Sequence, residues 1–151
     1  MKFVYISLSG NTKAFVEKLV DYLAFKHPEV FVETLDVKEL VKGGQDYPDL
    51  DQPYVAFLPT YLEGGNGVDT GDQEILTGDL RQLIAKGDNA SNCLGIVGSG
   101  NRNFNNQFCL TAYQYSKQFN FPVLDVYEMR GLTADVERIA EKIYQVYGFE
   151  N

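Results

Sequence analysis

Hydroxyl and amide side chains gather around one glycine near the N-terminus, in the segment Ser7-Leu8-Ser9-Gly10-Asn11-Thr12. The segment follows an apolar run and precedes a stretch with helical spacing, so its backbone N–H groups and the positive end of the helix dipole are expected to converge. The Ser and Thr hydroxyls can donate to phosphate oxygens, and Gly10 lets the backbone approach closely. The segment has no Lys or Arg, unlike a Walker A loop. It therefore predicts a phosphate site, with an ordinary Ser/Thr helix cap as the alternative.

Two later segments offer backbone and amide groups to a planar ligand. The first has an aromatic residue and then three glycines within four residues: Pro59, Thr60, Tyr61, Leu62, Glu63, Gly64, Gly65, Asn66 and Gly67. A peptide flip at Gly64 and Gly65 could present a carbonyl to the N5–H of a reduced flavin. The second is Gly98-Ser99-Gly100-Asn101-Arg102-Asn103-Phe104, whose amides suit the polar edge of a flavin and whose Phe104 suits its face. The alternatives are a glycine-closed surface loop and a polar turn with a buried Phe.

The elements around these segments alternate between strand and helix. Apolar runs predict strands at 2–8, 30–35, 54–59, 93–97 and 123–127, and residues 43–48 and 63–71 are expected to be loops. Helical spacing is typical of four stretches, marked by Phe15, Val16, Leu19, Val20 and Leu23; by Leu76, Leu80, Leu83 and Ile84; by residues 108–119; and by Val136, Ile139, Ile143 and Val146.

This alternation predicts an α/β fold, a flavodoxin-like doubly wound parallel sheet with strand order 2-1-3-4-5 and helices on both faces. One three-layer α/β/α domain is expected to span residues 1–151. Its ligand crevice would lie beyond the carboxyl ends of strands 1 and 3, where all three polar segments meet.

Composition excludes several function classes. With 151 residues, 44% hydrophobic and 23% charged, the chain is typical of a globular protein. Its net charge of −8 opposes binding to nucleic acid or to an anionic membrane. The first apolar run is too short for a signal peptide, so a cytoplasmic location with Cys93 and Cys109 reduced is expected. The single histidine, His27, is expected at the surface or at a helix end, and no metal site is predicted.

Three segments resemble one known family. Residues 7–12 resemble the flavodoxin TxTGxT pattern in the form SxSGNT, and GSGNRNF followed by Phe108 is similar to the GNRN segment of NrdI proteins. Glu128-Met129-Arg130-Gly131 followed by Asp135 resembles their E-x-x-G-x-x-x-D stretch. The resemblance covers almost the whole chain, and GNRN is its most specific part. Departures are Asn105, Cys109 and the acidic residues Glu63, Asp69 and Asp72.

The resemblance implies FMN as the cofactor and as the carrier of the chemistry, with no catalytic side chains. It implies phosphate contacts from Ser7, Ser9, Gly10, Asn11 and Thr12, flavin contacts from Thr60, Tyr61, Glu63, Gly64 and Gly65, and a ring site completed by Gly100, Asn101, Asn103 and Phe104. Leu8, Pro59, Leu62, Ser99, Phe108 and Cys109 complete the candidate set.

The partners implied by the resemblance are the dimanganese small subunit of class Ib ribonucleotide reductase, dioxygen, and an unidentified flavin reductase or other electron donor. Reduced FMN and dioxygen would supply the oxidant for assembly of the tyrosyl radical cofactor. One alternative is a general electron-transfer flavodoxin. A second is a cofactor-free interaction module such as a receiver domain, although a receiver needs acidic residues where this chain has Ser7 and Ser9.

Overall fold

Five parallel strands form the centre of the structure, a computed structural model that describes residues 1–60, 62–63, 73–74, 76–101 and 109–149, with residues 62–63 and 73–74 as backbone only. The strand order is β2-β1-β3-β6-β7, with bounds Glu33–Asp36, Lys2–Tyr5, Tyr54–Pro59, Cys93–Gly100 and Val123–Glu128. Numbered along the chain this is 2-1-3-4-5, so the predicted flavodoxin-like fold is confirmed. Two short antiparallel strands, β4 (Leu62–Glu63) and β5 (Gln73–Glu74), form a separate pair.

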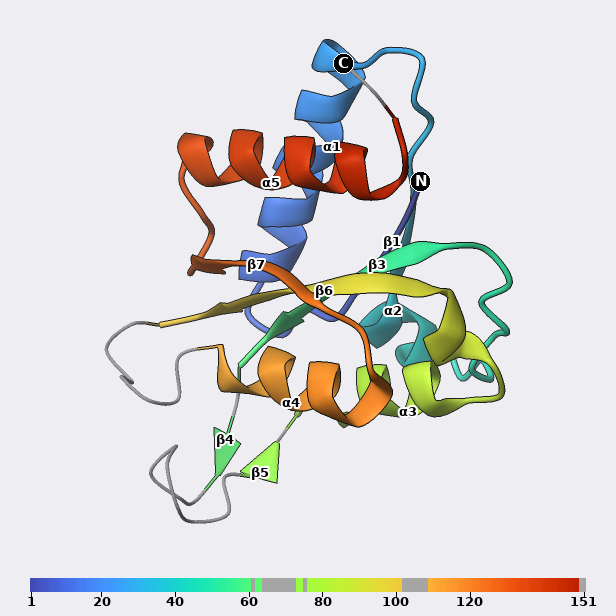
Figure 1. Cartoon of the computed structure of the whole chain (residues 1–151). Coiled ribbons are helices and arrows are strands. Elements are labelled where there is room, and N and C mark those ends of the chain that lie inside the picture. Colours follow the sequence, from blue (N-terminus) through green and yellow to red (C-terminus); the bar gives the residue numbers. More distant parts are fainter. Residues whose placement is uncertain (61, 64–72, 75, 102–108, 150–151) are drawn as a thin grey trace.

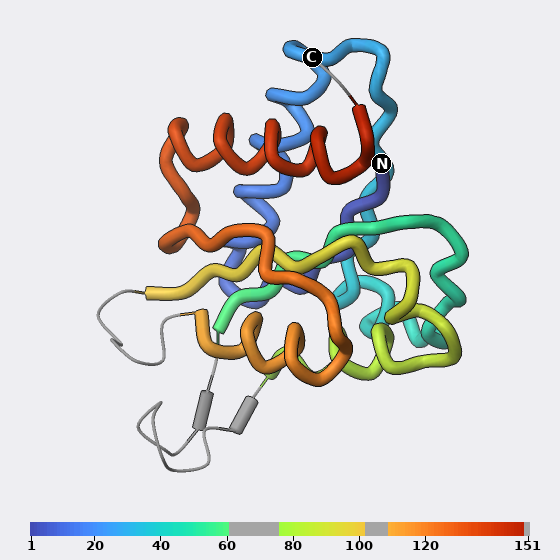
Figure 2. The backbone as a smooth tube through the Cα atoms, in the orientation of Figure 1, coloured from blue at the N-terminus to red at the C-terminus, as the bar shows by residue number. Residues whose placement is uncertain are grey.

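Helices cover both faces of the sheet (Figures 1 and 2). On one face lie α1 (Asn11–Lys26) and α5 (Thr133–Val146); on the other lie α2 (Val37–Lys42), α3 (Gly78–Ala85) and α4 (Leu110–Phe119). A 3₁₀ turn, η1 (Asn89–Asn92), precedes β6.

The strands send alternate side chains into two cores, because successive residues of a strand point to opposite faces. Phe3 of β1 and Phe57 of β3 pack with α1 and α5, whereas Val4 of β1 and Ala56 of β3 pack with the helices of the other face. All six residues of β3 are buried, as expected for a central strand between two helical layers.

Several predicted boundaries were wrong. The strand predicted at 2–8 ends at Tyr5, because the chain turns there toward α1, and the strand predicted at 30–35 begins only at Glu33. The strand predicted at 93–97 continues to Gly100, because residues 98–100 keep pairing with β7. Residues 98–100, which were predicted to lie in a loop, therefore belong to β6. Glu63, also predicted to lie in a loop, belongs to β4.

Two residues assigned to helices by their spacing are exposed. Leu76 is 65% exposed with φ 67°, since α3 begins only at Gly78, and Val146 is 37% exposed at the last position of α5. The short helix α2 was not predicted. It contributes one buried residue, Val37, and begins where Asp36 accepts a hydrogen bond from the Glu39 N–H at 3.2 Å.

His27 does lie at a helix end, the C-cap of α1, but it is buried rather than on the surface. Its Nε2 is 2.9 Å from Glu141 Oε1 of α5, and its ring stacks on Tyr144 at a centroid distance of 3.7 Å. The imidazole thus joins α1 to α5. Within the described ranges no helix is long and apolar enough to cross a membrane.

Candidate functional site

The predicted polar segments begin where β1, β3 and β6 end, and these are neighbouring strands. Their carboxyl ends share one edge of the sheet, where β3 and β6 end at the left of Figure 1. The structure describes residues 7–12, Pro59, Thr60, Ser99, Gly100, Asn101 and Cys109 fully, and Leu62 and Glu63 as backbone. Tyr61, Gly64, Gly65, Asn103, Phe104 and Phe108 lie outside the described residues. The strand order thus brings the starts of the predicted segments together.

The N-terminus of α1 begins at a glycine with open space beside it. Gly10 is the N-cap, with φ 93°, and a Cβ built on it would meet nothing within 4 Å. The Lys13 N–H donates a hydrogen bond to Ser7 Oγ at 3.1 Å. The side chain that caps the helix is therefore that of Ser7, three residues before the N-cap Gly10. The N–H groups of Asn11 and Thr12 have no partner within the helix, as at any helix start. This geometry suits an anion.

Several hydroxyl groups at this edge are buried. The side chains of Ser7, Thr12 and Ser99 are 8%, 1% and 3% exposed. Thr60 Oγ1 and Tyr127 Oη are buried and have no hydrogen-bond partner. A buried polar atom without a partner costs free energy, so these two atoms fit a ligand with polar groups at this edge.

Tyr127 was missed by sequence reasoning. Its buried hydroxyl lies beside the side chains of Thr12 and Ser99, but it has no hydrogen-bond partner at a suitable distance and angle. Burial raises the pKa of Tyr127, so the phenol stays neutral and able to donate. The sequence marks Tyr127 only as the end of an apolar strand. Its position between α1 and β6 depends on the pairing of Tyr127 with Ser99 across β6 and β7.

Arg130 was also missed as a site residue. Its Nε donates to Asn11 Oδ1 at 3.0 Å, across 119 positions of sequence. Both residues line an open cleft of about 760 Å³ between the β7–α5 turn and the start of α1. The tertiary structure thus brings a cation to a loop that contains none.

Neither Cys93 nor Cys109 forms a disulfide, and both are buried, which limits the reactivity of their thiols. Cys109 is the N-cap of α4 with φ 57°, and its side chain is fully buried. Burial raises the pKa of Cys93 to about 12, which keeps its thiol protonated. In the part of the chain that the structure describes, no group of three or more His, Cys, Asp or Glu could hold a metal ion.

Comparison with known proteins identifies the family. The family model described as "NrdI Flavodoxin like" matches residues 3–141. The chain belongs to the NrdI flavodoxin-like family. An NrdI-like protein of Streptococcus pneumoniae strain R6 is 57% identical over 150 residues, which cover 99% of this chain and 96% of that protein. Protein NrdI of Mycoplasma genitalium is 31% identical over 147 residues, covering 97% of this chain and 84% of the relative.

Solved flavodoxin structures share the fold. A short-chain flavodoxin associated with a PDU bacterial microcompartment superposes with a TM-score of 0.66 and 18% identity, covering 97% of this chain and 95% of that one. The Fusobacterium nucleatum flavodoxin mutant K13G bound to flavin mononucleotide superposes with a TM-score of 0.60 and 17% identity. The match covers 99% of this chain and 96% of that one. At these identities the likeness concerns the fold.

The structure explains two residues of the segment 128–135, which resembles a segment of NrdI proteins. Gly131 has φ 74°, and a Cβ there would lie 2.7 Å from the Phe15 ring, so only glycine fits this turn. Asp135 Oδ2 accepts a hydrogen bond from the Leu132 N–H at 2.8 Å and caps α5. In this NrdI-family chain the two residues therefore set where the β7–α5 turn lies against α1.

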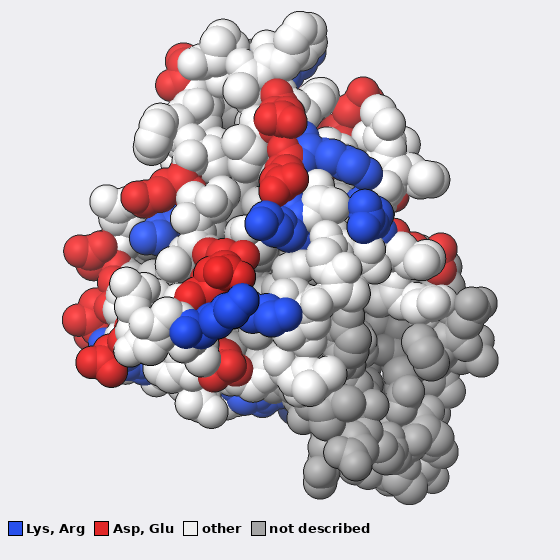
Figure 3. Space-filling model, turned by 180° about the vertical axis from the view of Figure 1, so that it is seen from behind, with Lys and Arg blue, Asp and Glu red and all other residues white. Residues whose placement is uncertain are grey.

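Positive and negative side chains are interspersed on the face of the molecule seen in Figure 3. On the face seen in Figure 3, Lys and Arg side chains alternate with Asp and Glu, and no broad basic area is present among the residues coloured there. The coloured part of this face therefore does not offer a basic path for a polyanion.

Proposed function

We propose that this protein binds FMN non-covalently at the carboxyl edge of its sheet. The observation that carries the proposal is the pair of buried, unpartnered hydroxyls, Thr60 Oγ1 and Tyr127 Oη, at the edge of the sheet where α1 begins. Membership of the NrdI flavodoxin-like family supports the same cofactor.

In this proposal the chain's residues hold the cofactor and control its surroundings. The α1 N-terminus, with Ser7, Ser9 and Thr12, binds the phosphate. Thr60 and the backbone of residues 62–63 and 99–101 bind the flavin. When bound, FMN supplies the redox chemistry, passing electrons from a donor to dioxygen to make an oxidant.

The proposed role is the delivery of that oxidant, in the cytoplasm, to the dimanganese small subunit of class Ib ribonucleotide reductase, for assembly of its tyrosyl radical. The family supports a link with ribonucleotide reductase. The alternative is a general electron-transfer flavodoxin, which the solved structural neighbours favour at the level of fold.

Two experiments test this function in order. The purified protein is first examined for bound yellow flavin and titrated with FMN; absence of binding would refute the cofactor assignment. The reduced protein is then mixed with manganese-loaded small subunit and air, and the tyrosyl radical is measured by electron paramagnetic resonance. An ordinary flavodoxin is the control. Equal radical yield from both proteins would favour the general electron carrier.

A further inference from the structure

We propose that Arg130 supplies the positive charge of the phosphate subsite and so makes the site select a flavin phosphate over an uncharged flavin. The inference rests on the proposed function, since it concerns the same site. It assigns a ligand-selecting role to a residue of the β7–α5 turn, far from the phosphate loop in sequence.

The turn that carries Arg130 is fixed on both sides of it. Met129 and Gly131 have φ 56° and 74°, in the left-handed region. The Met129 N–H donates to the Gly100 carbonyl at 2.9 Å, which ties the turn to the end of β6. Gly131 lies against the Phe15 ring of α1, with no room for a Cβ. Arg130 therefore leaves a backbone whose position is set by β6 and α1.

The guanidinium of Arg130 lies at the N-terminal end of α1. Its Nε donates to Asn11 Oδ1, and Asn11 is the first residue of the helix. The positive end of the helix dipole disfavours a cation there. An anion bound at the same place would be attracted by both the guanidinium and the helix dipole, and this attraction would outweigh their mutual repulsion.

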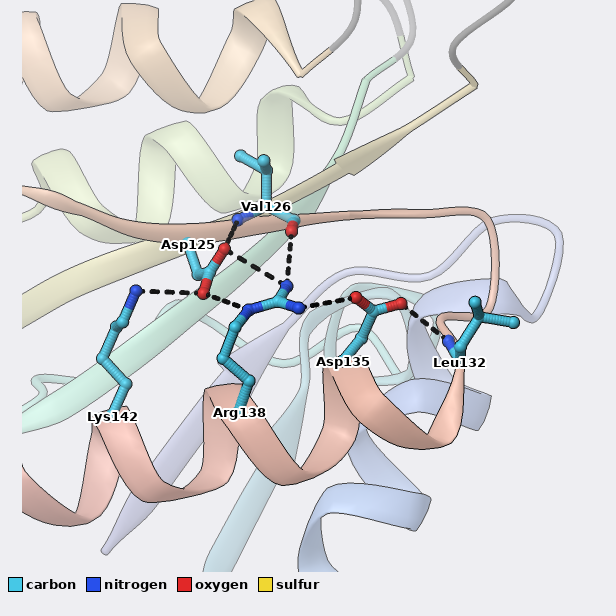
Figure 4. A network of polar contacts seen from close by, with 6 residues as sticks. All are labelled: Asp125, Val126, Leu132, Asp135, Arg138 and Lys142. Atoms are coloured by element: carbon cyan, nitrogen blue, oxygen red, sulfur yellow. Dashed lines mark hydrogen bonds and ion pairs between the residues drawn. The ribbon is translucent and has the colours of Figure 1, made fainter.

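A comparison with Arg138, which lines the same cleft, shows what is unusual about Arg130. Arg138 is neutralised by Asp125 and Asp135, with N–O distances of 2.9 Å to each (Figure 4). Arg130 forms no ion pair with any carboxylate that the structure describes, and its hydrogen bond goes to a neutral amide. Its charge is therefore available to a ligand.

A second observation indicates a ligand at this place. The hydroxyl of Tyr127 is buried without a hydrogen-bond partner, and it lies beside Thr12, the second residue of α1. The segment 7–12 contains no cation, and the whole chain has a net charge of −8. A phosphate monoester carries about −1.5 to −2 charge at pH 7, so a nearby guanidinium offsets repulsion from the rest of the chain.

The test compares FMN with riboflavin, which lacks the phosphate. Both are titrated by flavin fluorescence against wild type, Arg130→Met, Arg130→Lys and Lys13→Met. Lys13 is the matched control, because it is an exposed cation in the first turn of α1. We expect Arg130→Met to weaken FMN binding roughly tenfold and riboflavin binding less than about twofold, with partial recovery in Arg130→Lys. In about 1 M salt, where the Debye length is about 3 Å, the difference should shrink.

Each other outcome overturns a stated part of this assignment. Wild-type FMN affinity in Arg130→Met, or an equal loss for FMN and riboflavin, would reject Arg130 as a charge contact while leaving the proposed function in place. An equal effect of Lys13→Met would show that any cation near the helix start suffices. If the wild-type chain binds neither flavin, the proposed function itself fails.

Discussion

Phe15 of α1 and Tyr127 of β7 stack with their ring centroids 3.8 Å apart and an angle of 12° between the rings. This pair joins the helix that starts the candidate phosphate site to the strand that supplies its buried hydroxyl. Gly131 packs against both rings, because a Cβ built on it would lie 2.7 Å from Phe15 Cδ1 and 3.4 Å from Tyr127 Cδ2. The β7–α5 turn, α1 and Tyr127 thus form one packed unit beside the site.

The first prediction concerns Gly131. Gly131→Ala would place a Cβ 2.7 Å from Phe15 Cδ1 and would force alanine to adopt φ 74°. We expect it to lower the free energy of unfolding by about 2–4 kcal/mol, measured by urea denaturation. Gly148→Ala is the control, because Gly148 has φ 88° but nothing within 4 Å, and only the backbone cost of about 1–2 kcal/mol applies. Equal losses would show that the Phe15 contact does not matter.

The second prediction concerns Gly10. Gly10→Val should greatly weaken FMN binding without unfolding the protein, because the valine would fill the open space in front of the helix N-terminus. Gly44→Val is a matched control, with φ 73° and equally open surroundings between α2 and β3. Flavin content and circular dichroism are measured on both. Normal flavin content in Gly10→Val would remove this loop as the phosphate site.

The third prediction concerns the pH dependence of the network in Figure 4. Burial acts to raise the pKa of Asp125, but hydrogen bonds from Arg138 and Lys142 outweigh it and hold the pKa below its ordinary value. The stability that the carboxylate contributes is therefore present above the unfolded-state pKa of about 3.9 and is lost as pH falls through the lower folded-state pKa.

Asp125→Asn should thus destabilise the protein by about 1–3 kcal/mol at pH 7, and this difference should shrink on acidification below about pH 4. Urea denaturation across this pH range measures it. The exposed carboxylate Asp51 provides the control variant Asp51→Asn, which should have little effect. If the difference in unfolding free energy between wild type and Asp125→Asn stayed constant with pH, the lowered pKa of Asp125 would be contradicted.

The fourth prediction separates the two contacts of His27. His27→Ala loses both the hydrogen bond to Glu141 and the stack on Tyr144, and should cost about 2–4 kcal/mol of unfolding free energy. His27→Phe keeps an aromatic ring for the stack and loses only the hydrogen bond, so it should cost less. Thermal and urea unfolding of both variants provide the measurement. An equal loss in His27→Phe and His27→Ala would show that the ring stack contributes nothing.

Local sequence patterns predicted the class of fold, which the structure confirms, and proposed where the candidate site lies. Strand and helix periods are local properties, so the alternation of apolar runs could be read directly, and β3 was predicted at its observed bounds, Tyr54–Pro59. The glycine and hydroxyls of residues 7–12 marked the turn before α1, and the order of a doubly wound sheet then indicated which loops meet. The resemblance to NrdI proteins rested on local segments in the same way, and the family model matches.

Contacts between residues that are far apart in the chain depend on the tertiary structure. The extension of β6 to Gly100 depends on pairing with its neighbours, and the exposure of Leu76 depends on where α3 begins. His27 meets Glu141 across 114 positions, and Arg130 meets Asn11 across 119. Such contacts depend on how helices pack on a twisted sheet, which no local period records. For this reason the candidate phosphate segment 7–12, which contains no cation of its own, has Arg130 beside it in the folded structure.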